Sequence, residues 1–121
     1  MKANELRIGN WVEASVQFQI DAKFIYEYSV VGGDYKPIPL TEKWLVKFGF
    51  DKDGKMKGTG FLFRICFDEK APYAYLETYG GGEYKIEIEY IHQLQNLYFA
   101  LTGEELTIKA QHEQRETKRG I

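Results

Sequence analysis

Few side chains in this chain could do nucleophilic or acid–base chemistry. Nucleophilic catalysis needs a thiol or hydroxyl within reach of a base, and the inventory is Cys66, His92 and His112. Cys66 lies in an alternating apolar run, where a small half-buried thiol is the usual explanation. His92 falls on the polar side of a helical pattern and His112 in a polar tail, so we expect both to face solvent. A structural zinc site normally needs four Cys or His ligands, so we expect none.

The loop and carboxylate motifs also give only weak evidence for a metal, phosphate or catalytic site. Asp51-Lys52-Asp53-Gly54 resembles the start of a calcium loop, but Leu62 stands where the bidentate acid belongs. Residues 58–60 and 80–82 are glycine-rich, yet they adjoin strands and are better interpreted as turns than as phosphate-binding loops. Glu87 and Glu89 fall on the wet face of a predicted strand, which indicates solvated carboxylates and not an acid–base pair. We therefore expect no enzymatic activity, no cofactor and no metal.

The charge is nearly balanced overall but uneven along the chain. There are 16 Lys and Arg against 18 Asp and Glu, which removes the simplest argument for a nucleic-acid or membrane-surface partner. Residues 68–105 hold eight acids and two lysines. This segment is a docking face for a basic partner, a nucleic-acid mimic, or the ordinary wet face of a sheet. The tail from Lys109 onward is weakly basic, which is too little to predict DNA binding.

Aromatic residues make up 16% of the chain. Phe99 lies about 140° from the centre of the apolar stripe of its predicted helix, so either the chain itself or a partner should cover it. Tyr73, Tyr75 and Tyr79 share one strand face and could belong to an interface or to the rim of the core. The candidate interaction surface consists of Phe99, His92, Tyr73, Tyr75, Tyr79, Glu87 and Glu89. Most other aromatics are assigned to the core: Phe18, Phe48, Phe61, Phe63, Phe67, Tyr84, Tyr90 and Tyr98.

The elements that position these residues begin with a strand-like region from Leu6 to Val31. Its period of two predicts strands at 12–20 and 24–31 joined by a turn at Asp21-Ala22, an antiparallel hairpin of small-barrel character. A short helix follows, with Thr41 as N-cap, Leu40 placed to pack on Leu45, and Gly49 as the terminator.

After an exposed connection at 51–60, the pattern predicts strands at 60–68, 73–79 and 83–90. The last alternates without exception, which is typical of an antiparallel sheet with one wet face. Residues 91–101 change to the helical period, and Thr102-Gly103 ends that helix.

We therefore predict a single α+β domain over residues 1–106: hairpin, short helix, three-stranded antiparallel meander, and a C-terminal helix packed on the sheet. Residues 107–121 should be a frayed helix or a disordered tail. The N-terminus lacks a signal-peptide pattern, no stretch is long and apolar enough for a membrane helix, and there is a single cysteine. These features predict a cytoplasmic protein without a membrane partner.

Three stretches, Asn4–Val12, Pro37–Phe50 and His92–Gly103, together resemble a family of small uncharacterised proteins of gut bacteria and their prophages or mobile elements. The resemblance implies no activity, cofactor or catalytic residue. It implies a bacterial or prophage setting, in which small acidic proteins often bind a host protein.

Two functional hypotheses follow. The leading one is a non-enzymatic protein-interaction module that binds a protein partner or associates with itself. The alternative is a nucleic-acid-binding accessory protein that uses the 52–57 loop (Lys52, Lys55 and Lys57) and the basic tail, with tyrosines for stacking.

Overall fold

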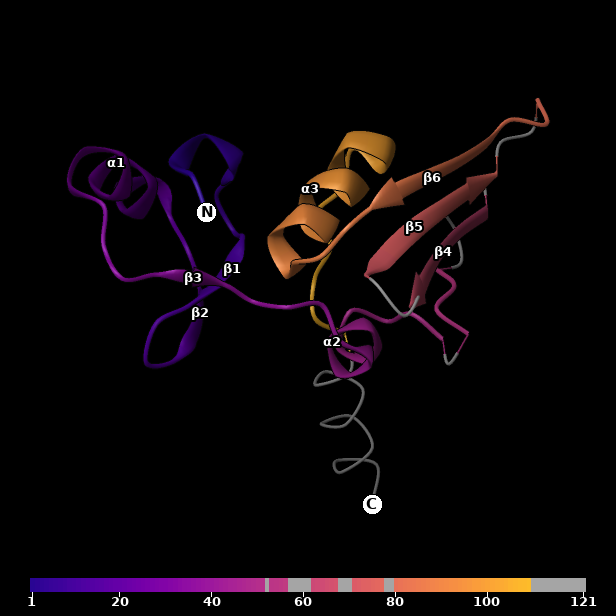
Figure 1. Ribbon diagram of the computed structural model, residues 1–121, viewed down its shortest axis with the longest axis horizontal. Coiled ribbons are helices and arrows are strands. Elements are labelled where there is room, and N and C mark those ends of the chain that lie inside the picture. Colours follow the sequence, from indigo (N-terminus) through magenta and orange to yellow (C-terminus); the bar gives the residue numbers. More distant parts are fainter. Residues whose placement is uncertain (52, 57–61, 68–70, 78–79, 110–121) are drawn as a thin grey trace, which may run out of the picture. The chain divides into compact units, whose positions relative to one another are not determined.

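The computed structural model describes residues 1–51, 53–56, 62–67, 71–77 and 80–109. They form an α+β protein with two three-stranded antiparallel sheets, which confirms the predicted class (Figure 1). The chain divides into two compact units. The N-terminal unit joins Met1–Pro39 to Tyr90–Glu105, and the central unit joins Leu40–Glu89 to the segment that begins at Leu106.

The N-terminal unit is built on a small sheet of order β2-β1-β3. After the 3-10 turn η1 (Ala3–Glu5) come β1 (Trp11–Glu13) and β2 (Gln17–Gln19), and β3 (Lys36–Pro37) pairs with the other side of β1. A hairpin is thus present, but it turns at residues 14–16, where the backbone N–H of Ala14 donates to the carbonyl of Val16 at 3.0 Å. The predicted long strand at 12–20 is two short ones.

The predicted second arm of the hairpin, residues 24–31, is wrong: this segment is helix α1 (Ala22–Val31). Asp21, expected in a turn, is its N-cap and accepts a hydrogen bond from the backbone N–H of Phe24 at 2.8 Å. Phe24, Ile25 and Tyr28 share one helical face. That face packs against a buried cluster from the preceding segments, consisting of Leu6, Val12 and Ile20.

Helix α2 (Glu42–Lys47) in the central unit has the caps that the sequence predicts. The Thr41 side chain accepts from the backbone N–H of Trp44 at 3.5 Å. The N–H of Gly49 donates to the carbonyl of Val46, and that of Phe50 donates to the carbonyl of Leu45. These two bonds form a Schellman motif, which needs the left-handed backbone of Gly49 at φ 92°.

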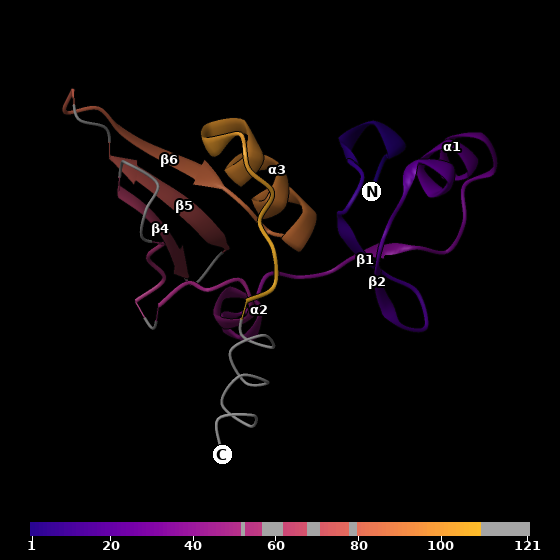
Figure 2. The same ribbon diagram turned by 180° about the vertical axis from the view of Figure 1, so that it is seen from behind.

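The predicted meander is also confirmed. Strands β4 (Leu62–Phe67), β5 (Pro72–Glu77) and β6 (Glu83–Glu87) form an antiparallel sheet in that order, with β6 at an edge (Figures 1 and 2). The buried residues of one face are Phe63, Ile65, Ala74 and Leu76.

The core assignment of Tyr84 and Phe67 is wrong, since they are 56% and 43% exposed. Every residue of β6 is exposed. Tyr84 lies opposite the buried Leu76 and therefore on the core side of the sheet. The strict alternation of this strand identifies which side chains share a face, but the core does not extend beneath the edge strand.

Helix α3 (Ile91–Thr102) ends at Gly103 with φ 75°, close to the predicted limits, and contacts β1. Leu94 is fully buried in it. Of the other aromatics assigned to the core, Phe48, Phe63 and Tyr98 are buried, Phe18 and Tyr90 are half-buried, and Phe61 lies outside the described residues. No helix in the described part of the chain is long and apolar enough to cross a membrane.

Candidate functional site

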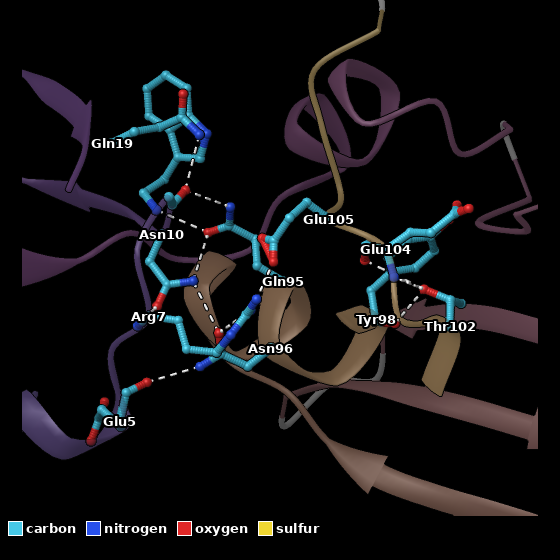
Figure 3. Close-up of polar contacts among 12 residues, drawn as sticks. Glu5, Arg7, Asn10, Gln19, Gln95, Asn96, Tyr98, Thr102, Glu104 and Glu105 are labelled. Atoms are coloured by element: carbon cyan, nitrogen blue, oxygen red, sulfur yellow. Dashed lines mark hydrogen bonds and ion pairs between the residues drawn. The ribbon is translucent and has the colours of Figure 1, made fainter. Parts of the chain in front are cut away.

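One stripe of helix α3 carries polar side chains and faces the N-terminal segment between η1 and β1 (Figure 3). The stripe consists of the polar residues His92, Gln95 and Asn96 and of the aromatic Phe99, which recur at the helical spacing. The segments that meet here are Asn4–Val12 and His92–Gly103.

Two amides of α3 satisfy the backbone of the N-terminal segment. Gln95 Oε1 accepts from the N–H of Trp11 at 2.9 Å, while its Nε2 donates to the carbonyl of Gly9 at 3.0 Å. Asn96 Nδ2 donates to the carbonyl of Glu5 at 2.8 Å, and its Oδ1 accepts from Asn10 Nδ2 at 3.0 Å. Asn10 and Gln95 are buried, so these bonds replace water that the fold has excluded.

Phe99 is covered on one side by the chain itself. The Arg7 guanidinium lies 4.0 Å from the centre of the Phe99 ring, a cation–π contact. Arg7 also donates to Asn96 Oδ1 at 3.1 Å and forms an ion pair with Glu105. Phe99 keeps 40% of its surface exposed. Of the two expected covers, the chain itself or a partner, the chain supplies the contact seen here.

The prediction that His92 faces solvent is wrong, because the side chain is fully buried. Its Nε2 lies 2.8 Å from Glu5 Oε1. Burial lowers the pKa of His92 below its ordinary value and outweighs the hydrogen bond and charge of Glu5, which raise it. Burial also raises the pKa of Glu5, but hydrogen bonds from the Lys2 backbone and from His92 outweigh it, so that pKa is lowered. This pair joins η1 to helix α3 within the N-terminal unit.

A second group of predicted residues meets on the outer face of the meander, opposite its buried side chains. Tyr73 lies between Cys66 and Glu87, and Tyr75 lies between Arg64 and Lys85. Both tyrosines are half-buried. We call this surface the tyrosine face; it consists of Leu62, Arg64 and Cys66 from β4, Tyr73, Tyr75 and Glu77 from β5, and Glu83, Lys85 and Glu87 from β6.

Contacts within the tyrosine face hold both rings. Lys85 Nζ lies 4.3 Å from the centre of the Tyr73 ring. The Tyr75 hydroxyl is hydrogen-bonded to Glu83, and this bond raises the pKa of Tyr75. The two central aromatics are thus fixed by charged side chains of the edge strand.

A cavity of about 610 Å³ lies between α2, the loop at 51–54 and the end of β4. Cys66, Phe67 and Tyr73 line it, together with several carboxylates. One of these, Asp51, accepts from the backbone N–H groups of Asp53 and Lys55 at 2.9 Å and supports the loop. Among the described residues, no histidine lines the cavity and no metal-binding cluster of His, Cys, Asp or Glu occurs.

The predicted interaction surface therefore separates into groups. His92 and Phe99 belong to the N-terminal unit, whereas Tyr73, Tyr75 and Glu87 lie together on the tyrosine face. Glu89 is exposed just beyond β6, and Tyr79 lies outside the described residues. Lys52, Lys57 and the tail at 110–121, invoked for nucleic-acid binding, also lie outside them; Lys55 is exposed.

Sequence reasoning missed the residues that hold the N-terminal segment: Arg7, Asn10, Gln95 and Asn96. Their contacts join segments more than eighty positions apart and leave no local signal in the sequence. A comparison with protein-family models, curated proteins and solved structures finds no match for this chain.

Proposed function

We propose that this protein is a non-enzymatic protein-interaction module whose binding surface is the tyrosine face. One observation carries the proposal: two half-buried tyrosines stand at the centre of a sheet face whose other residues, apart from the half-buried Cys66, are exposed. An outer sheet face that meets only water usually alternates charged and small polar residues. Aromatic residues in such a position are enriched where a partner excludes water.

The arrangement of this face fits that role. Tyrosine offers a large, rigid contact area with a polar tip, and the two rings here are surrounded by charged residues from both neighbouring strands. The contacts of Lys85 with Tyr73 and of Glu83 with Tyr75 restrict the rings before binding. A partner then loses less side-chain entropy in ordering them.

The charges around the rings favour a protein partner over a nucleic acid. Arg64 and Lys85 stand against three acids, Glu77, Glu83 and Glu87. A phosphate backbone would be repelled by this excess of carboxylates, whereas a protein can present complementary charges of both signs. The resemblance to proteins of gut bacteria and their prophages favours a bacterial host protein as the partner.

The test is affinity capture from a bacterial lysate with matched tyrosine variants. Tyr73→Ser combined with Tyr75→Ser removes both rings from the tyrosine face. Tyr26→Ser is the control, because Tyr26 is 70% exposed on α1 in the other unit. Thermal unfolding establishes that each variant is folded.

We expect the wild type and the Tyr26→Ser control to capture the same protein in equal yield. The double variant should lose more than about 10-fold of that yield, since buried aromatic anchors carry much of an interface's energy. Equal capture by the folded double variant would contradict the proposal.

A further inference from the structure

The two edge strands of the meander differ in whether another segment pairs with their outer side. At the β4 edge, the segment Gly54–Met56 runs alongside the strand: Met56 N–H donates to the carbonyl of Phe63 at 3.2 Å, and Ile65 N–H donates to that of Gly54 at 2.8 Å. At the β6 edge, no segment among the described residues pairs with the outer side of Glu83–Glu87. Within the described sheet, β5 is the one strand that pairs with β6, which Figure 2 shows at the sheet edge. The second edge is an open template for another strand.

The pairing with β5 determines which backbone groups point outward. The N–H of Ile88 donates to the carbonyl of Pro72 at 3.1 Å, so Ile88 points its backbone groups toward β5. Because these groups alternate along a strand, Tyr84 and Ile86 also point theirs inward. Glu83, Lys85 and Glu87 point theirs outward, where they can pair with an added antiparallel strand.

The open stretch ends at Glu87. By the same alternation, the backbone groups of Glu89 also point outward. The carbonyl of Glu89, however, already accepts from the N–H of Leu40 at 2.9 Å. An added strand must therefore overlap the part of β6 nearer to Glu83.

We propose that a second copy of this chain pairs with β6 as an antiparallel strand, related by a two-fold axis that passes beside Tyr84, perpendicular to the sheet. Glu83 of each copy then lies opposite Lys85 of the other, so two opposite-charge pairs form across the junction. The two Tyr84 rings meet and cover side chains that are 56% exposed in the single chain. Gly82 lies opposite Ile86 of the second copy and presents no side chain to obstruct it.

Moving the two-fold axis along β6 to Lys85 or to Ile86 gives registers that are energetically less favourable. An axis beside Lys85 would set Lys85 against its own copy and Glu83 against Glu87, and like charges directly opposite are destabilising. An axis beside Ile86 would require Glu83 to pair with Glu89, whose carbonyl is occupied by Leu40. Charge and access therefore select the axis beside Tyr84.

The pairing would extend the meander into a six-stranded sheet, with the two tyrosine faces on the same side because the axis is perpendicular to the sheet. The inference does not rest on the proposed function. It uses the backbone edge of β6 together with Glu83 and Lys85, which are also part of the tyrosine face, and it is tested without any other protein.

The experiment is sedimentation equilibrium at low salt with two charge reversals, Glu83→Lys and Lys85→Glu. Each variant alone places like charges opposite each other in its own dimer. The dimer dissociation constant of each should rise by about 10-fold or more relative to the wild type. When the two variants are mixed, Lys faces Glu again at both positions, so dimers should reappear at the wild-type affinity.

Rescue by mixing separates pairing from a folding defect, because a misfolded variant would not recover in the mixture. The control is Glu27→Lys, the same charge reversal at an exposed position of α1 in the other unit, and it should dimerise as the wild type does. A wild type that stays monomeric up to its solubility limit would overturn the inference. So would a Glu83→Lys variant that dimerises more tightly, since that result belongs to the axis beside Lys85.

Discussion

His92 lies on the same stripe of α3 as Gln95 and Phe99, and this stripe faces the chain's own N-terminal segment. An imidazole in that place needs a partner, and Glu5 supplies one for Nε2. The sequence pattern locates His92 correctly off the apolar stripe of its helix. It does not reveal that the polar side is covered as well, because the covering residues lie more than eighty positions away along the chain.

The buried His92–Glu5 pair predicts a loss of stability in acid. The pKa of His92 is lowered in the folded state, so below its ordinary value of 6.5 the unfolded chain binds the extra proton more readily. The pKa of Glu5 is also lowered, so its contribution is lost at still lower pH, as the carboxyl protonates in the fold. The free energy of unfolding in urea should fall as the pH drops through 6.5 toward 4.5.

His92→Gln removes the titrating imidazole and keeps a hydrogen-bond donor for Glu5. The pH dependence of its unfolding free energy between 8 and 5.5 should be flatter than that of the wild type. If the two pH profiles are parallel, His92 does not titrate differently on folding and its burial is misassigned.

At the scale of elements, α1 and α2 show what a sequence can predict. Both begin at a capping residue, Asp21 and Thr41. The α2 signals agree with one another: cap, hydrophobic staple and terminal Gly49. In α1, aromatic and β-branched residues recur at every second position from Phe24 to Val30, so the strand period masks the helical face of Phe24, Ile25 and Tyr28. Tertiary packing decides in favour of the helix.

The helical assignment of α1 is testable at its cap. Asp21→Ala removes the acceptor for the N–H of Phe24 and should lower the free energy of unfolding by about 1 kcal/mol. Asp21→Asn keeps a side-chain oxygen that can cap the helix, so its free energy of unfolding should stay close to that of the wild type. Denaturant titration followed by circular dichroism measures both. Equal stability of the Ala and Asn variants would indicate that Asp21 does not cap a helix.

At the scale of the whole molecule, the sequence predicts its strands and helices better than the long-range contacts between them. The meander and α3 follow from local periodicity, and where the predicted limits fall on described residues they differ from the observed ones by a few residues. The contacts of Arg7 with Asn96 and Phe99 join distant segments and leave no local signal. The tyrosine face is predictable in part. Alternation predicts that Tyr73 and Tyr75 share a face, but the strand register that places Arg64 and Lys85 beside them is seen only in the structure.

The most direct measurement of the central claim uses Cys66, the chain's single cysteine, which lies on the tyrosine face opposite Tyr73. Its thiol is half-buried, so its alkylation rate reports access to this face. The measurement is that rate with and without a saturating amount of the captured partner, with the Tyr73→Ser, Tyr75→Ser variant as control. We predict that the partner slows alkylation of the wild type by about 10-fold or more, as expected for a thiol within a water-excluding interface, and leaves the variant's rate unchanged. An unchanged rate for the wild type bound to its partner would contradict the assignment of the tyrosine face as the binding surface.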